Sequence, residues 1–139
     1  MTEITSEIKT IPHSQQKVFD ALSDMSKLEM VRDKMAHEKV KKVSFEKDSF
    51  SFSFNPIGDV QFSIVERQAP SAIKFVANPS PIDVSLWVHL SEIKPEETQM
   101  KLTVDAELNP FLKAMVMKPL QEGVNKMAEM LASVPYDDI

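Results

Sequence analysis

The chain contains no cysteine and only two glycines, Gly58 and Gly123, among its 139 residues. Without cysteine it has no disulfide, no thiolate nucleophile and no cysteine-ligated zinc or iron–sulfur centre. Two isolated glycines cannot build a glycine-rich phosphate loop, and the G-x-S-x-G turn of serine hydrolases is absent as well. These absences exclude several common kinds of site, but they do not indicate which function the protein has.

Long apolar runs and a positive net charge are also missing. No stretch approaches the ~18 apolar residues of a membrane-spanning helix, and the N-terminal MTEITSEIKT is acidic where a secretory signal is basic. Sixteen Lys and Arg against 21 Asp and Glu give a net charge of −5, which disfavours binding to nucleic-acid backbones. We therefore expect one cytoplasmic domain, residues 1–139, with no membrane span and no nucleic-acid partner.

The first quarter of the chain predicts one strand and two short helices. Apolar and polar residues alternate over residues 4–11, and Pro12 then ends the strand. Ser14 is placed to cap a helix over residues 15–23, because its hydroxyl can accept from the free N–H groups of the first turn. A second short helix is expected after Ser26, with an apolar face made of Leu28, Val31 and Met35.

Between residues 38 and 108 the period of the apolar residues changes from about 3.6 to about two. Phe50, Phe52 and Phe54 alternate with serines, which is the pattern of a half-buried strand. Turn sequences rich in Pro, Asn, Gly and Asp separate the later strands. Because successive strands are joined by short turns, this region predicts an antiparallel meander of six strands.

The last part of the chain predicts a long helix over about residues 110–133. Asn109 is a helix-capping residue, and Pro110 suits the first helical position. Apolar residues then recur at helical spacing and form a broad face. Pro119 should bend this helix, because proline removes one hydrogen bond and crowds the carbonyl four residues before it.

This order of elements, together with three stretches, resembles the SRPBCC superfamily of START-related lipid-transfer domains and polyketide cyclases. The stretches are IPHS through VFDALSD (11–24), VERQAP through IKF (65–75), and LTV (102–104) before the terminal helix. The resemblance implies an α+β helix-grip (START-like) fold: a curved antiparallel sheet of six to seven strands around a long C-terminal helix, with two short helices after the first strand. It also implies an apolar ligand cavity between the sheet and that helix.

Strand parity and the apolar face of the last helix together predict which residues line this cavity. In most of the strands the even-numbered residues should face inward, with Phe75 beside them and with Trp87 and His89 on the opposite face. The expected cavity residues are Phe52, Phe54, Phe62, Ile64, Phe75, Leu86, Val88, Leu102, Val104, Met115, Leu120 and Met127. Phenylalanine and methionine are also ordinary core residues, so simple packing under the helix is the alternative for the same positions.

No catalytic residue, metal site or cofactor is predicted. The histidines are scattered over a turn, a loop and a strand, at His13, His37 and His89. The carboxylates that could act as a general acid or base are expected at the surface, at Asp59, Glu66 and Asp105.

Three functions remain open at this point. The leading hypothesis is a carrier or sensor whose partner is a small hydrophobic or amphipathic ligand, and a homodimer is left open. The second is an enzyme of the polyketide cyclase or isomerase type that uses the same cavity. The third is a protein-interaction module like the chaperone-activating branch. An all-apolar cavity favours the first, a polar group pointing into it the second, and a filled core with an exposed apolar patch the third.

Overall fold

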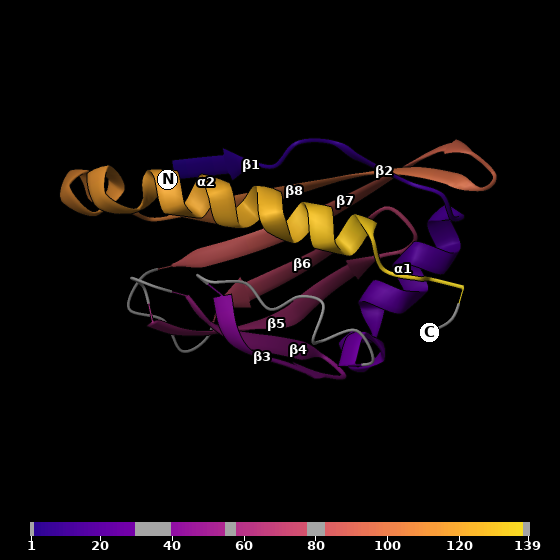
Figure 1. Cartoon of the computed structure of the whole chain (residues 1–139), viewed down its shortest axis with the longest axis horizontal. Helices are drawn as coiled ribbons and strands as arrows, with labels where there is room; N and C mark the ends of the chain where they lie inside the picture. Colours follow the sequence, from indigo (N-terminus) through magenta and orange to yellow (C-terminus); the bar gives the residue numbers. More distant parts are fainter. Residues whose placement is uncertain (1, 30–39, 55–57, 78–82, 138–139) are drawn as a thin grey trace.

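Eight strands form one antiparallel sheet that lies against a long C-terminal helix (Figure 1). The structure is a computed structural model that describes residues 2–29, 40–54, 58–77 and 83–137, with the backbone alone at residues 40 and 54. The strands are β1 Thr2–Thr5, β2 Lys9–Ile11, β3 Val40–Glu46, β4 Ser49–Phe54, β5 Gly58–Gln68, β6 Ala72–Ala77, β7 Val84–Lys94 and β8 Glu97–Ala106. The helices are α1 Gln15–Ser23 and α2 Pro110–Ala132. The predicted helix-grip architecture is therefore confirmed.

Strands β3 to β8 form the expected meander, and β1 and β2 return from the N-terminus to pair with β8. The strand order is β1-β8-β7-β6-β5-β4-β3, with β2 beside β8. In the register of β4 on β5, Phe50 lies opposite Phe62, and Phe52 lies opposite Val60. The alternation of Phe with Ser in β4 thus places its aromatic rings on the same face as the apolar residues of β5.

Both helices begin where their capping residues predict. The Ser14 side chain accepts a hydrogen bond from the backbone N–H of Lys17, and α1 follows directly. The Asn109 side chain accepts from the N–H of Leu112 at 2.8 Å, and Pro110 takes the first helical position of α2. Pro119 lies inside α2, which continues past it to Ala132, and the bend expected there stays a prediction.

The N-terminal segment differs from the prediction: it forms two strands, and the sheet has eight strands rather than six to seven. The break falls at Ser6, whose N–H donates to the Leu102 carbonyl while its hydroxyl accepts from the Leu102 N–H at 2.9 Å. Ile8, which strict alternation would bury, is 60% exposed. The Ser6 hydroxyl has replaced a backbone carbonyl as the acceptor for the Leu102 N–H. The strand pairing is therefore interrupted without leaving this buried N–H unpaired.

The second short helix is only partly tested. Residues 25–29 form a 3₁₀ turn, in which Met25 and Leu28 are buried. The remainder of that prediction, with Val31 and Met35, lies outside the described residues.

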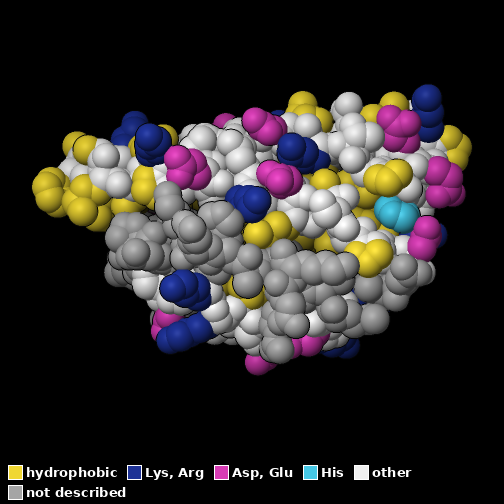
Figure 2. Space-filling view, in the orientation of Figure 1, with side chains coloured by type: hydrophobic (Ala, Val, Ile, Leu, Met, Phe, Trp, Pro, Cys, Tyr) yellow, Lys and Arg dark blue, Asp and Glu magenta, His cyan; other side chains and the backbone are white. Residues whose placement is uncertain are grey.

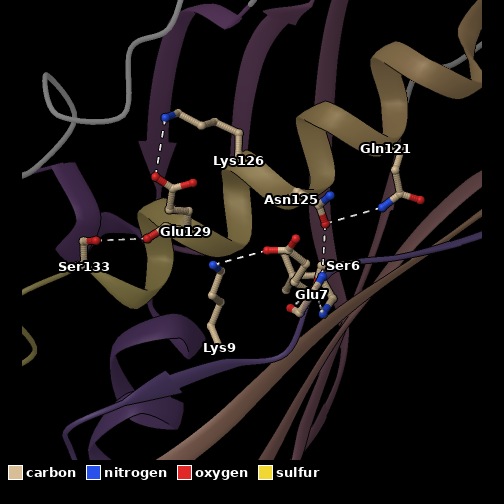
Figure 3. A network of polar contacts seen from close by, with 9 residues as sticks. Ser6, Glu7, Lys9, Gln121, Asn125, Lys126, Glu129 and Ser133 are labelled. Atoms are coloured by element: carbon tan, nitrogen blue, oxygen red, sulfur yellow. Dashed lines mark hydrogen bonds and ion pairs between the residues drawn. The ribbon is translucent and has the colours of Figure 1, made fainter.

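Helix α2 packs most closely on β8, β1 and β2, at one side of the sheet. Figure 1 shows it running along that side, with α1 at the end of the sheet near the C-terminus of α2. Polar side chains fix this placement, and Gln121 donates to the Thr5 carbonyl at 2.9 Å. The Glu7 N–H donates to Asn125 at 3.0 Å, as Figure 3 shows. Helix α2 therefore makes its closest backbone contacts with the side of the sheet formed by β8, β1 and β2.

Candidate functional site

An apolar cavity of about 360 Å³ lies between α2 and the inner face of the sheet. Its volume falls within the usual range of small-molecule sites. Strands β3 to β8 each contribute side chains, α1 contributes Leu22, and Met25 follows from the 3₁₀ turn. Helix α2 packs against β1, β2 and β8, and the cavity lies beside that contact, bounded by residues of β3 to β8.

Phenylalanines form the wall of the cavity on the side of the sheet. Phe50 is central to them, because its ring stacks on Phe62 at 5.4 Å between centroids and meets Phe75 edge-on at 5.3 Å. Phe52 stacks on Phe50 at 5.9 Å and extends the row. Each ring is thus held by its neighbours, which makes this wall rigid.

The helix supplies the opposite wall, which is made mainly of flexible or branched aliphatic side chains. The residues of α2 that line the cavity are Leu112, Met115, Val116, Leu120, Gly123, Val124, Lys126, Met127, Met130 and Leu131. The three methionines among them can adjust their shape at little cost, because their side chains are unbranched. A rigid aromatic wall facing an adaptable aliphatic wall suits an apolar guest of variable shape.

The lining of the cavity is almost entirely apolar. Of the 26 described lining residues, 24 are apolar, and the other two are Gly123 and Lys126. Lys126 has a side chain that is 39% exposed, and its Nζ lies 3.7 Å from Glu129 Oε1. Figure 3 shows Lys126 leaving α2 on a different flank from Gln121 and Asn125, so it does not take part in fixing the helix to β1 and β2.

The structure brings nine of the twelve predicted cavity residues together around this space. They are Phe52, Phe62, Phe75, Leu86, Val88, Val104, Met115, Leu120 and Met127. Two others belong to the packed core without lining the cavity: Leu102 is fully buried, and Ile64 is partly buried against the core cluster. The side chain of Phe54 lies outside what the structure describes. Trp87 and His89 are less buried than Leu86 and Val88, as alternation predicts.

Sequence reasoning missed Lys126 and the contribution of the first helix. Lys126 lies three residues after Gly123 and four before Met130, so it shares a helical stripe with two other lining residues. A lone charge inside an otherwise apolar stripe was the signal that could have identified it. Leu22 and Met25 show no comparable signal, because nothing local indicates that α1 closes one end of the cavity.

The remaining polar candidates lie away from the cavity. Asp59 and Glu66 are exposed and Asp105 is partly buried, and none of the three lines it. His89 stacks on Trp87 with 5.8 Å between centroids, and burial together with nearby Lys101 lowers the pKa of the His89 imidazole. Within the described part of the chain, no group of three or more His, Cys, Asp or Glu side chains is arranged to hold a metal ion.

Comparison with known proteins finds likeness in structure and none in sequence. No family model and no curated protein matches the sequence. Norcoclaurine synthase from Thalictrum flavum superposes with a TM-score of 0.70 at 12% identity, over 94% of this chain and 84% of that one.

Two further solved structures show the same arrangement. A protein from Thermobifida fusca gives a TM-score of 0.66 at 13% identity, covering 99% of this chain and 95% of that one. A START superfamily protein from Mycobacterium smegmatis gives 0.58 at 10% identity, covering 93% and 98%. The chain therefore has an SRPBCC-type, START-like helix-grip fold. Among the described residues, no helix is long and apolar enough to cross a bilayer.

Proposed function

We propose that this protein is a carrier or sensor that holds a small hydrophobic or amphipathic molecule in the cavity between the sheet and α2. The observation that carries the proposal is the composition of the lining, in which 24 of 26 described residues are apolar around about 360 Å³. Transfer of an apolar molecule from water into such a space is favourable in proportion to the area buried, at about 25 cal/mol per Å².

The lining supports binding more strongly than it supports acid–base catalysis of the cyclase or isomerase type. General acid–base catalysis needs a proton donor or acceptor within hydrogen-bond reach of the substrate. Among the described lining residues, Lys126 alone can ionise, and none carries a carboxylate, an imidazole or a hydroxyl. The likeness to norcoclaurine synthase concerns the fold, and a fold alone does not specify a reaction.

A neutral fluorescent probe tests the proposal. N-phenyl-1-naphthylamine should bind with a saturable rise in fluorescence, and unlabelled apolar competitors should displace it. Leu120→Trp and Met115→Trp each place a large ring at the cavity wall and should weaken probe binding about tenfold or more by occupying its volume.

A tryptophan on the outside of the molecule provides the matched control. Val65 lies in β5, is 59% exposed and does not line the cavity, so Val65→Trp should leave the probe titration unchanged. Circular dichroism and thermal melting are used to check that all three variants are folded. Absence of saturable binding to the folded wild type, or equal effects of all three tryptophans, would remove the support for a carrier or sensor.

A further inference from the structure

The cavity is apolar throughout its described lining except at one place, where Lys126 reaches its rim. The side chain is partly buried, and Lys126 belongs to the same stripe of α2 as Gly123 and Met130. A lysine in this position covers apolar surface with its methylene stem and keeps its ammonium group in contact with water. The Lys126 ammonium is the one charged group that the described lining residues carry.

The present partner of Lys126 leaves that ammonium available. Glu129 is three residues further along α2, its side chain is 60% exposed, and the two charged atoms are 3.7 Å apart. An exposed ion pair of this kind contributes little to stability. An ammonium group also has three N–H donors, so an additional oxygen can bind without displacing Glu129.

The glycine one turn before Lys126 adds a second feature to the same stripe. Gly123 lies in the interior of α2, where glycine is less favourable than alanine. It lines the cavity without presenting a side chain. The wall therefore carries no side chain at the position one turn before Lys126.

We infer that the ligand of this cavity is an amphipathic anion, with an apolar body among the phenylalanines and one acidic group on the Lys126 ammonium. This inference rests on the proposed function. An anionic group elsewhere in the lining would be buried without a partner, which is strongly unfavourable. At Lys126 it gains a charge-assisted hydrogen bond and keeps part of its hydration.

Matched probes with one ten-carbon chain test this directly. Decanoate, decyl phosphate and decanol are each titrated as competitors of N-phenyl-1-naphthylamine on the wild type, on Lys126→Met and on Lys118→Met, at pH 8 and low salt. Lys118 is an exposed lysine of α2 that does not line the cavity, and it controls for loss of one positive charge. The quantity compared is the ratio of an anion's dissociation constant to that of decanol. This ratio removes the contribution of the ten-carbon alkyl chain, which all three probes share.

In Lys126→Met the dissociation constant of at least one anion should rise roughly three- to tenfold, while that of decanol stays the same. The more affected anion identifies the acidic group as carboxylate or phosphate. Lys118→Met should change neither ratio, and 0.5 M NaCl should reduce the difference between the wild type and Lys126→Met. Glu129→Gln should tighten binding of the same anion.

Three results would overturn the inference, and they differ from the failure of the proposed function. Equal loss of anion and decanol binding in Lys126→Met would assign the residue to packing alone. Unchanged anion binding in Lys126→Met, or the same loss in Lys118→Met, would show that Lys126 does not select the ligand. In all these cases decanol still binds to the wild type, whereas failure of every probe to bind would instead reject the cavity as a ligand site.

Discussion

At the scale of single residues, Tyr136 joins the C-terminal tail to the body of the protein. Its side chain is 2% exposed, and its hydroxyl donates a hydrogen bond to the Leu131 carbonyl at 2.6 Å. The ring of His13 meets it edge-on at 5.5 Å between centroids. Burial raises the pKa of the Tyr136 phenol, so this group stays a neutral donor across the ordinary pH range.

Tyr136→Phe should lower the free energy of unfolding by about 1–2 kcal/mol, because it leaves a buried carbonyl without its donor. Urea denaturation followed by far-UV circular dichroism measures the change. Ser133→Ala is the control: the Ser133 hydroxyl donates to the Glu129 carbonyl at 3.0 Å on the exposed side of α2, so its loss should matter much less. Equal destabilisation by the two variants would contradict the role given to burial.

Asp137, the next residue, should make stability depend on pH. Its carboxylate pairs with the Lys17 ammonium and lies 3.5 Å from His13 Nδ1, and the hydrogen bond from Lys17 lowers the pKa of Asp137. A carboxyl group with a lowered folded-state pKa stabilises the protein above its unfolded-state pKa and loses that contribution as the pH falls through the lowered value.

The urea midpoint of Asp137→Asn should therefore be slightly below that of the wild type at pH 7, and the two midpoints should converge as the pH falls through the lowered pKa of Asp137. The effect is small because the pair is exposed. Salt provides the control, since 0.5 M NaCl should shrink the difference at pH 7. A difference that persists in acid would assign the effect to something other than the charge of Asp137.

At the scale of the elements, the N-terminal segment shows how one side chain redirects a strand. The Ser6 hydroxyl accepts from the Leu102 N–H and donates to the Glu7 carbonyl at 2.9 Å, which separates β1 from β2. The backbone around this break is then free to contact α2, through Thr5 and Glu7. The same interruption that splits the strand thus helps to hold α2 at one side of the sheet.

Ser6→Ala should destabilise the protein by about 1–3 kcal/mol, because the buried N–H of Leu102 loses its acceptor. The variant should also accelerate amide hydrogen exchange at Leu102, measured by NMR. Thr10→Ala, at an exposed position of β2, is the matched control and should change stability by less than about 0.5 kcal/mol. Slow exchange at Leu102 in Ser6→Ala would show that the backbone has closed the gap by itself.

Local signals predicted the elements well and the cavity incompletely. Ser14 and the Asn109-Pro110 pair located both helices, because a cap acts within a single turn and can be recognised from neighbouring residues. The break at Ser6 was missed because its partner, Leu102, is almost a hundred residues away. Strand parity likewise identifies the residues that face inward. It does not separate Leu86 from Leu102, which are both buried, although only Leu86 lines the cavity.

At the scale of the whole molecule, one apolar interior has two parts with different packing. Near β1, β2 and β8 it is filled, and Ile4, Ile11, Met100 and Leu102 are each exposed by no more than 1%. Between α2 and β3 to β6 the interior is hollow. Figure 2 shows apolar side chains gathered at the outer end of α2, where Phe111 is 74% exposed. The helix is thus anchored by one flank and leaves the other flank over the cavity.

Two leucines, one from each part, should respond differently to the same truncation. Leu102→Ala removes a side chain surrounded by close-packed atoms and should cost about 2–5 kcal/mol of unfolding free energy. Leu120→Ala removes a side chain that already borders empty space and has fewer contacts to lose, so it should cost about half as much or less. It should also preserve or strengthen binding of N-phenyl-1-naphthylamine, since it enlarges the cavity. Urea unfolding monitored by Trp87 fluorescence measures both costs, and equal costs would indicate that the cavity is closed by collapse of α2 onto the sheet in solution.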